Sequence, residues 1–415
     1  MSDRHDPHDD LPPLGAIKAG LERTTEVLAN ELAHPTGDTP DWTALEWRLA
    51  TAAATVHGVG GQRDIYGRWR HTAWVRFLES QREHVALRHQ RIAALLERID
   101  AEARGMGLPL VALKGAALHA LGVYEPGERP MADIDLLVSE ADRERAGAML
   151  ERIGYVLGSA SWKHHAYKPA EGAPHAGPGE HRDTPVNIEL HTRIQERLPV
   201  STVDITHCIY PRAPVPGINP YPSHGALMSH LLLHAAGCIC SRSTRLIHLN
   251  DISLLATRMM RGEWLALWGD GTTEPPWWAL PPLLLVSRYY HGAVPATLLY
   301  ELERDCPAVL RFASKHLTLT QVSLSELWLH AWPGIEWARS VREVGQYVRN
   351  RVRPSAEARQ ERADMVRTQL WLQESTWVTS SQLHRIVAWL THPVTRTDTM
   401  YAVRAALGQA PAAWA

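Results

Sequence analysis

Residues 108–138, LPLVALKGAALHALGVYEPGERPMADIDLLV, decide the fold of this chain. The stretch indicates an apolar strand over 108–113, a turn at Lys114 and Gly115, a short helix, a loop, and a second strand that carries Asp133 and Asp135. Strand side chains alternate between the two faces of a sheet, so both carboxylates are predicted to project to the same side. Burying two like charges side by side is costly unless a cation or a basic group lies between them.

A divalent cation is the natural partner of the two carboxylates. Magnesium binds hard oxygen ligands, typically one or two carboxylates together with phosphates of a substrate. The turn at Lys114 and Gly115 points the same way, because a strand, a glycine turn and a helix start leave backbone N–H groups directed at a phosphate. Lys114 adds a positive charge for that phosphate. The stretch therefore predicts a site for a metal ion and a phosphate group.

A second motif, VNIELHTRI at residues 186–194, alternates apolar and polar side chains. As a strand it turns Asn187, Glu189 and His191 to one face. Glu189 is thus available as a third carboxylate. His191 either contacts a substrate or orients Glu189, and the orienting role is the simpler prediction.

The motifs LKGAAL, RPMADIDLLV and VNIELHTR, in this order, resemble the uncharacterised nucleotidyltransferase family of bacterial proteins, within the DNA polymerase beta type nucleotidyltransferase superfamily. The resemblance covers roughly residues 92–268. It implies that Asp133, Asp135 and Glu189 are catalytic and bind Mg²⁺, with Mn²⁺ as an alternative. In the implied two-metal scheme, both aspartates hold the metal on the triphosphate, and Glu189 joins them at the second metal, which activates the acceptor hydroxyl. Alternatively, Glu189 is a general base.

The phosphate-binding turn departs from the pattern of that superfamily. Members usually have Gly-Ser or Gly-Gly there, whereas this chain has Gly115 followed by Ala116. Without a serine hydroxyl, Lys114 and the backbone amides at Gly115 are expected to carry more of the phosphate contact. Arg129, four residues before Asp133, could bind a phosphate with two hydrogen bonds or be an ordinary surface arginine.

The same residues allow other interpretations. Asp133 and Asp135 alone would be read as exposed strand-end carboxylates paired with arginine, and the turn upstream and Glu189 downstream favour the metal site. We predict a nucleotidyltransferase that moves an NMP from an NTP to a hydroxyl-type acceptor on a small molecule, peptide or protein. The alternatives are a catalytically weak nucleotide-binding or regulatory module of the same fold, and a phosphoryl transferase.

Outside this core the chain is predicted to be largely helical, which makes the fold class α+β. A small mixed-sheet nucleotidyltransferase core is expected at 106–200. Around it we predict a disordered tail at 1–12, a helical N-terminal region at 13–105, a helical region at 201–348 and a helical C-terminal tail at 349–415.

Composition narrows the range of partners. Hydrophobic residues make up 45% of the 415 residues, charged residues make up 21%, and the formal net charge is -2. This balance predicts a globular protein without broad attraction to long nucleic acids or anionic membranes. Four cysteines in so long a chain do not indicate a disulfide scaffold. The polar start and the lack of a long apolar run favour a cytoplasmic location without a membrane segment.

Histidines and cysteines recur at other places. Four fall on one apolar helical segment: His230, His234, Cys238 and Cys240. Zinc accepts such ligands, but the segment is so apolar that buried packing is the interpretation we adopt. Four more, near a Gly- and Pro-rich insert, are interpreted as solvated loop residues: His164, His165, His175 and His181. Asp251 is expected to cap a following helix or to approach the substrate, and capping is simpler.

Overall fold

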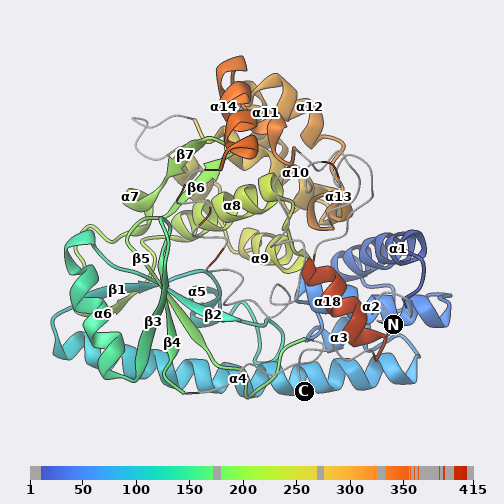
Figure 1. The fold of residues 1–415 in the computed structure, drawn as a ribbon, viewed down its shortest axis with the longest axis horizontal. Coiled ribbons are helices and arrows are strands. Elements are labelled where there is room, and N and C mark those ends of the chain that lie inside the picture. The colour runs from blue at the N-terminus through green and yellow to red at the C-terminus, as the bar shows by residue number, and fades with distance from the viewer. Residues whose placement is uncertain are drawn as a thin grey trace, which may run out of the picture.

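The computed structural model describes residues 11–171, 179–268, 275–324, 332–354 and 397–408, and the single positions 356, 359, 363, 383 and 387. Within these residues the protein has the predicted α+β fold, with a mixed sheet beside helices from both ends of the chain (Figure 1). Most of the predicted disordered tail and most of the predicted C-terminal tail lie outside the described residues. In the part that is described, no helix is both long enough and apolar enough to cross a bilayer.

The N-terminal region is helical, as predicted, and consists of α1 (Leu14–Ala33), α2 (Ala44–His57), α3 (Arg63–Tyr66) and α4 (Thr72–Gly105). Local sequence sets the ends of α2. Thr43 and Glu46 form a reciprocal capping box at its start, and Gly58, with a φ of 68°, ends it in the left-handed conformation. Four tryptophans pack against one another in this region, with ring centroids 4.8–6.2 Å apart: Trp42, Trp47, Trp69 and Trp74.

The core is a six-stranded mixed sheet with the strand order β3-β4-β5-β2-β1-β8. Its strands are β1 (Pro109–Ala112), β2 (Asp133–Leu137), β3 (Tyr155–Ala160), β4 (His165–Pro169), β5 (Asn187–His191) and β8 (Gly217–Asn219). The central strands β2 and β5 are parallel, and β1 runs antiparallel to β2. Three helical segments follow β1 and β2: α5 (Lys114–Ala120), the 3-10 helix η1 (Glu140–Asp142) and α6 (Arg143–Arg152).

Two strands, β7 (Ser201–Asp204) and β8, lie after residue 200, where the helical region was predicted to begin, so the start of that region was predicted too early. β6 (Gln195–Leu198) and β7 form a hairpin, and after the short α7 (Thr206–Ile209) strand β8 joins the sheet beside β1. Pattern analysis misses β8 because three residues are too few to show an alternation. Asn219 of β8 donates a side-chain hydrogen bond to the Leu110 carbonyl at 3.1 Å. The sheet therefore extends past the predicted core limit at residue 200.

The two faces of the sheet differ in chemistry. One face packs against α4 and α6 through apolar side chains that include Ile134 and Leu136. The alternate side chains of Asp135, Glu189 and His191 lie on the other face. This second face borders a cleft whose far wall comes from α8 (His224–Ser241), α9 (Leu246–Ala256) and the turn between them. The sheet therefore separates an apolar core from a polar site.

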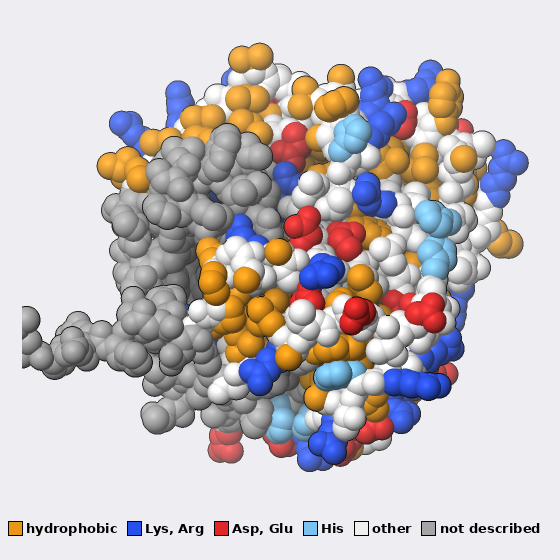
Figure 2. Space-filling model, turned by 90° about the vertical axis from the view of Figure 1, so that its right-hand side faces the viewer, with side chains coloured by type: hydrophobic (Ala, Val, Ile, Leu, Met, Phe, Trp, Pro, Cys, Tyr) orange, Lys and Arg blue, Asp and Glu red, His pale blue; other side chains and the backbone are white. Residues whose placement is uncertain are grey.

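The remaining helical segments follow α9 in the chain, and most of them lie beyond α8 in Figure 1. They are η2 (Glu263–Trp268), η3 (Trp277–Ala279), α10 (Leu280–Tyr289), α11 (Ala296–Asp305), α12 (Ala308–Ser314), α13 (Leu319–Ser323), η5 (Ile335–Trp337), α14 (Val341–Val352) and α18 (Thr397–Ala406). α18 returns to pack against α2, so segments from both ends of the chain lie side by side. Acidic and basic side chains are interspersed on the face shown in Figure 2, in keeping with the small net charge.

Candidate active site

β2 and β5 bring the three predicted carboxylates together. Their parallel register places Asp135 opposite Glu189, and Asp133 opposite Asn187. His191 lies next to two of the carboxylates, with Nε2 3.0 Å from Asp135 Oδ1 and 3.6 Å from Glu189 Oε2. The alternation inferred from the sequence thus holds on both strands.

Lys114 and Gly115 form the start of α5, directly beside the carboxylates. Lys114 Nζ lies 3.0 Å from Asp135 Oδ1. Lys114 has a φ of 46°, a left-handed backbone that is strained for a residue such as lysine. Gly115 has no room for a side chain, because a Cβ would collide with Arg129 Nη1. The strained turn therefore carries the ammonium group to Asp135, and the glycine allows Arg129 to pack closely.

The two aspartates of this site differ in their neighbours: Asp135 has basic partners, whereas Asp133 has none among the described residues. Burial and the neighbouring Asp135 and Glu189 raise the pKa of Asp133. Burial acts to raise the pKa of Asp135 too, but Lys114 and His191 outweigh it and hold that pKa well below its usual value. In the part of the chain that the structure describes, the half-buried Asp133 side chain has neither a hydrogen bond nor an ion pair. Such a group fits a cation that takes oxygen ligands.

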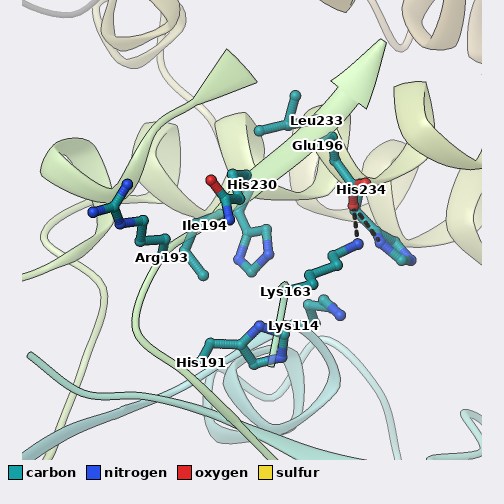
Figure 3. Close-up of a pocket in the computed structure, with 10 residues that line it drawn as sticks. Lys114, Lys163, His191, Arg193, Ile194, Glu196, His230, Leu233 and His234 are labelled. Atoms are coloured by element: carbon teal, nitrogen blue, oxygen red, sulfur yellow. Dashed lines mark hydrogen bonds and ion pairs between the residues drawn. The ribbon is translucent and has the colours of Figure 1, made fainter. Parts of the chain in front are cut away.

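A cleft of about 300 Å³ opens over the carboxylates. Its lining comes from opposite walls, and includes Lys114, Gly115, Arg129, Asp133, Asp135, Glu189, His234, Arg245 and His248. A smaller cavity of about 10 Å³, room for a single water, lies between His191 on β5 and His230 and His234 on α8 (Figure 3). The larger cleft is at the lower end of the volumes found for small-molecule sites, about 300–1,000 Å³.

The family described as uncharacterised nucleotidyltransferase matches residues 43–272, which is more than half of the chain and includes all the cleft residues. The chain belongs to this family. No curated protein and no solved structure matches it. The family resemblance inferred from the three motifs is confirmed, and membership of the DNA polymerase beta type superfamily stays a prediction.

In this family member, Arg129 is held by Asp251. Arg129 Nε donates to Oδ1 at 2.8 Å and Nη2 donates to Oδ2 at 2.7 Å, in a pair that is almost fully buried. Tyr124 Oη also donates to Asp251 Oδ1, at 2.8 Å. Asp251 lies inside α9, so the interpretation of this residue as a helix cap is wrong. The phosphate contact of Arg129 stays a prediction: Asp251 accepts from two of its nitrogens, and the third, Nη1, lies beside Gly115 and donates to the Pro130 carbonyl at 3.3 Å.

His164 belongs to the site, and the sequence analysis missed it. Its Nδ1 lies 3.3 Å from Glu189 Oε2, and its ring meets the ring of His191 edge-on at 5.1 Å. The residue directly precedes β4, which pairs with β5 and so brings His164 to Glu189. The solvated-loop interpretation is wrong for His164 and for His165, which lies in β4. The extended pattern at 164–168 is the signal that could have found it; His175 lies outside the described residues.

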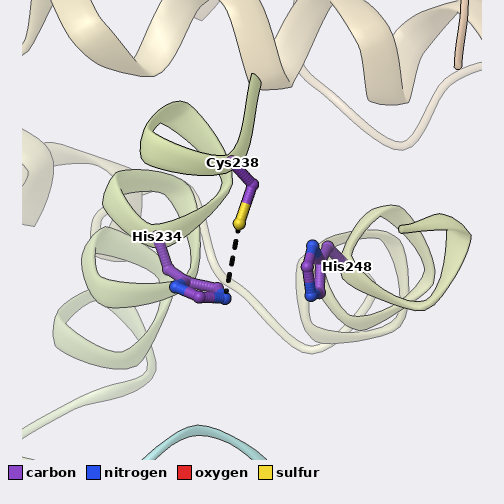
Figure 4. Close-up of side chains that lie close together, drawn as sticks. All are labelled: His234, Cys238 and His248. Atoms are coloured by element: carbon purple, nitrogen blue, oxygen red, sulfur yellow. Dashed lines mark hydrogen bonds between the residues drawn. The ribbon is translucent and has the colours of Figure 1, made fainter. Parts of the chain in front are cut away.

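A second cluster lies at the opposite wall of the cleft. His234 and Cys238, one turn apart on α8, meet His248 of α9 (Figure 4). The packing interpretation is right for His230 and Cys240, which are buried and do not join any cluster of possible metal ligands found among the described residues. It is incomplete for His234 and Cys238, which are only half-buried. Sequence reasoning could not have added His248, because its place depends on how α9 packs against α8.

The second cluster is strongly polarised. Burial acts to raise the pKa of Cys238, but His234 and His248 outweigh it and lower that pKa well below its usual value. Burial acts to lower the pKa of His234, but Cys238 outweighs it and raises that pKa to about 9. Cys238 and His234 therefore each favour the charged form of the other.

Proposed function

We propose that the chain is a metal-dependent nucleotidyltransferase that moves an NMP from an NTP to a hydroxyl-type acceptor on a small molecule, peptide or protein. The observation that carries the proposal is the meeting of Asp133, Asp135 and Glu189 on one face of two parallel strands, at the cleft. Membership of the nucleotidyltransferase family supports the reaction class. Asp133, which has no partner among the described residues, supports the metal.

The three carboxylates would hold Mg²⁺, or Mn²⁺ in its place. The donor set fits because these ions prefer carboxylate oxygens, and Lys114 and His191 leave Asp133 unmatched. When bound, the ion would neutralise charge on the triphosphate and lower the pKa of the acceptor hydroxyl.

Three other residues are proposed to bind the triphosphate. Lys114 Nζ already lies at the carboxylates, so an incoming phosphate would share it with Asp135. Gly115 would offer its backbone N–H to the phosphate, and its lack of a Cβ leaves room for Arg129 Nη1 beside it. Arg129 would reach the phosphate through Nη1, by exchanging the 3.3 Å hydrogen bond that Nη1 donates to the Pro130 carbonyl, while Asp251 holds its Nε and Nη2.

The proposed reaction is a displacement at the α-phosphorus. The acceptor oxygen forms a new P–O bond in line with the bond to the leaving pyrophosphate, which breaks. His191 holds Asp135 and lies beside Glu189, so it keeps both carboxylates in place. If Glu189 acts as the general base, it takes the hydroxyl proton.

Calorimetry tests the proposal directly. The four NTPs are titrated with and without Mg²⁺ into the wild-type chain and into the Asp133→Ala/Asp135→Ala variant. We expect Mg²⁺-dependent binding of at least one NTP by the wild type. In the variant, binding should be weakened by about 100-fold or more, since two metal ligands are lost. Asp305→Ala, at the exposed end of α11, is the matched control and should bind as the wild type does. A wild-type chain that binds no NTP with Mg²⁺ or Mn²⁺ refutes the proposal.

Two alternatives use the same site and differ in their products. A regulatory module would bind the NTP without turnover, and a phosphoryl transferase would add a phosphate. Mass spectrometry of a modified acceptor separates them, because an added NMP exceeds an added phosphate by the nucleoside. The three carboxylates favour NMP transfer over mere binding, since burying like charges together is costly for a surface that only binds.

A further inference from the structure

His234, Cys238 and His248 have the composition of a transition-metal site. Their possible ligand atoms, one from each residue, all lie within 4.8 Å of one another, and His234 Nε2 is 3.7 Å from Cys238 Sγ (Figure 4). Tetrahedral zinc, bound about 2.0 Å from nitrogen and about 2.3 Å from sulfur, holds such ligands about 3.5 Å apart. The two side chains on α8 are thus close to metal-ligand spacing, and a small inward shift of His248 completes the set.

Glu196 of β6 orients His234. His234 Nδ1 lies 3.8 Å from Glu196 Oε1, and Lys163 Nζ pairs with the same oxygen (Figure 3). With Nδ1 directed at a carboxylate, Nε2 is the nitrogen that faces Cys238. Histidines that bind metals typically direct their second ring nitrogen at a carboxylate in this way.

His248 has one unprotonated ring nitrogen. The Arg245 backbone N–H donates to its Nδ1 at 3.3 Å, which requires a lone pair there. Neutral imidazole is the form that binds metal ions. A metal on Nε2 leaves the ring proton on Nδ1, and a metal on Nδ1 takes its lone pair. Either mode of binding therefore exchanges this long hydrogen bond for a metal–nitrogen bond. The protons displaced from Cys238 and His234 pass to solvent.

The cluster opens into the cleft. His234 and His248 both line the cleft over the carboxylates, whereas Cys238 does not. Across the described residues, no fourth histidine, cysteine or acidic residue joins these three. Three protein ligands with an open fourth position are typical of catalytic zinc sites, whereas structural zinc sites have four.

We propose that His234, Cys238 and His248 bind one zinc ion whose fourth coordination position faces the cleft. A hydroxyl oxygen of the acceptor would occupy that position, a role that rests on the proposed nucleotidyl transfer. The zinc site itself is independent of it, because none of its three ligands belongs to the carboxylate site.

Cobalt substitution tests the site on the full chain. After removal of metals, the chain is titrated with Co²⁺ without any NTP. We expect a thiolate-to-cobalt charge-transfer band, with the absorption of tetrahedral cobalt, that saturates at one Co²⁺ per chain; Co²⁺ at the carboxylates would not contribute to this band. Cys238→Ser should abolish the charge-transfer band, and His248→Ala should weaken binding about 10-fold or more. The matched control is Cys208→Ser, which removes a half-buried cysteine 3.2 Å from His207 and should keep the band.

The Asp133→Ala/Asp135→Ala variant separates the two proposals, because the charge-transfer band should persist when NTP binding is lost. No such band in the wild type, or a band that Cys208→Ser abolishes, would overturn the zinc site. If Cys238→Ser fails to fold, the wild-type spectrum and the His248→Ala titration still decide. Acetohydroxamate, a ligand for open metal positions, should change the Co²⁺ spectrum, and an unchanged spectrum would overturn the open position.

Discussion

Two acidic residues near the cleft are stabilised in opposite ways. Asp251 on α9 accepts two hydrogen bonds from Arg129 and one from Tyr124. Asp133 on β2 accepts none from the described residues, although the carboxylate of Asp135 lies beside it. A paired buried charge holds two elements together, whereas an unpaired one is a cost that a bound cation relieves. From this difference we infer that Asp251 stabilises the fold, and we propose that Asp133 binds a ligand.

The largest effect on stability should come from Asp251→Ala. The change leaves the buried Arg129 guanidinium without its counter-charge, and breaking a buried pair in this way costs about 3–5 kcal/mol. Urea unfolding measures the free energy. A loss below about 1 kcal/mol, the range of an exposed ion pair, would show that Asp251 is not a structural element.

Gly115→Ala tests the contact between the Lys114–Gly115 turn beside the carboxylates and Arg129, which Asp251 binds. The added Cβ would collide with Arg129 Nη1 and press on Met131 Sδ, so we expect a loss of about 1–3 kcal/mol by overpacking and weaker NTP binding. Gly105→Ala is the matched control, because nothing lies within 4 Å of a Cβ there. Equal unfolding free energies for the two variants would show that the turn can accommodate a Cβ at position 115.

Of these three variants, Asp133→Asn should change the free energy of unfolding least, and it should raise that free energy rather than lower it. Burial and two carboxylates raise the pKa of Asp133 above its value in the unfolded chain, so its ionisation opposes folding as the pH rises from about 4 towards neutral. The variant should therefore be more stable than the wild type, by about 1 kcal/mol at pH 8 once solvent screening is allowed for, and by less at pH 5. Unfolding at both pH values measures this, and destabilisation at pH 8 would mean that Asp133 has a structural partner.

The features that depend on local sequence, namely the strand alternation and the turn, were predicted correctly. Strand alternation placed Asp133 and Asp135 on one face, and the same period placed Glu189 with His191. The turn at Lys114 followed from its position between an apolar strand and a helix. These predictions succeeded in the fold because a period of two survives in any sheet that buries one face.

The sequence could not predict contacts set by tertiary packing. Arg129 and Asp251 are 122 positions apart, and only the packing of α9 beside the loop before β2 makes them a pair. His164 reaches Glu189 through the β4–β5 pairing, whose register no local pattern fixes. His248 contacts His234 and Cys238 only because α9 packs against α8. The carboxylates of the site therefore follow from local sequence patterns, whereas the residues around them are brought in by strand pairing and helix packing.

The most direct test of the central claim compares two properties of the same Asp133→Asn sample. One is the unfolding free energy, and the other is calorimetric binding of NTP in the presence of Mn²⁺. We predict a chain at least as stable as the wild type that has lost its metal-dependent NTP binding. A chain of wild-type stability that still binds NTP and Mn²⁺ as the wild type does would contradict the claim that the unpaired carboxylate on β2 exists to bind a metal and a nucleotide.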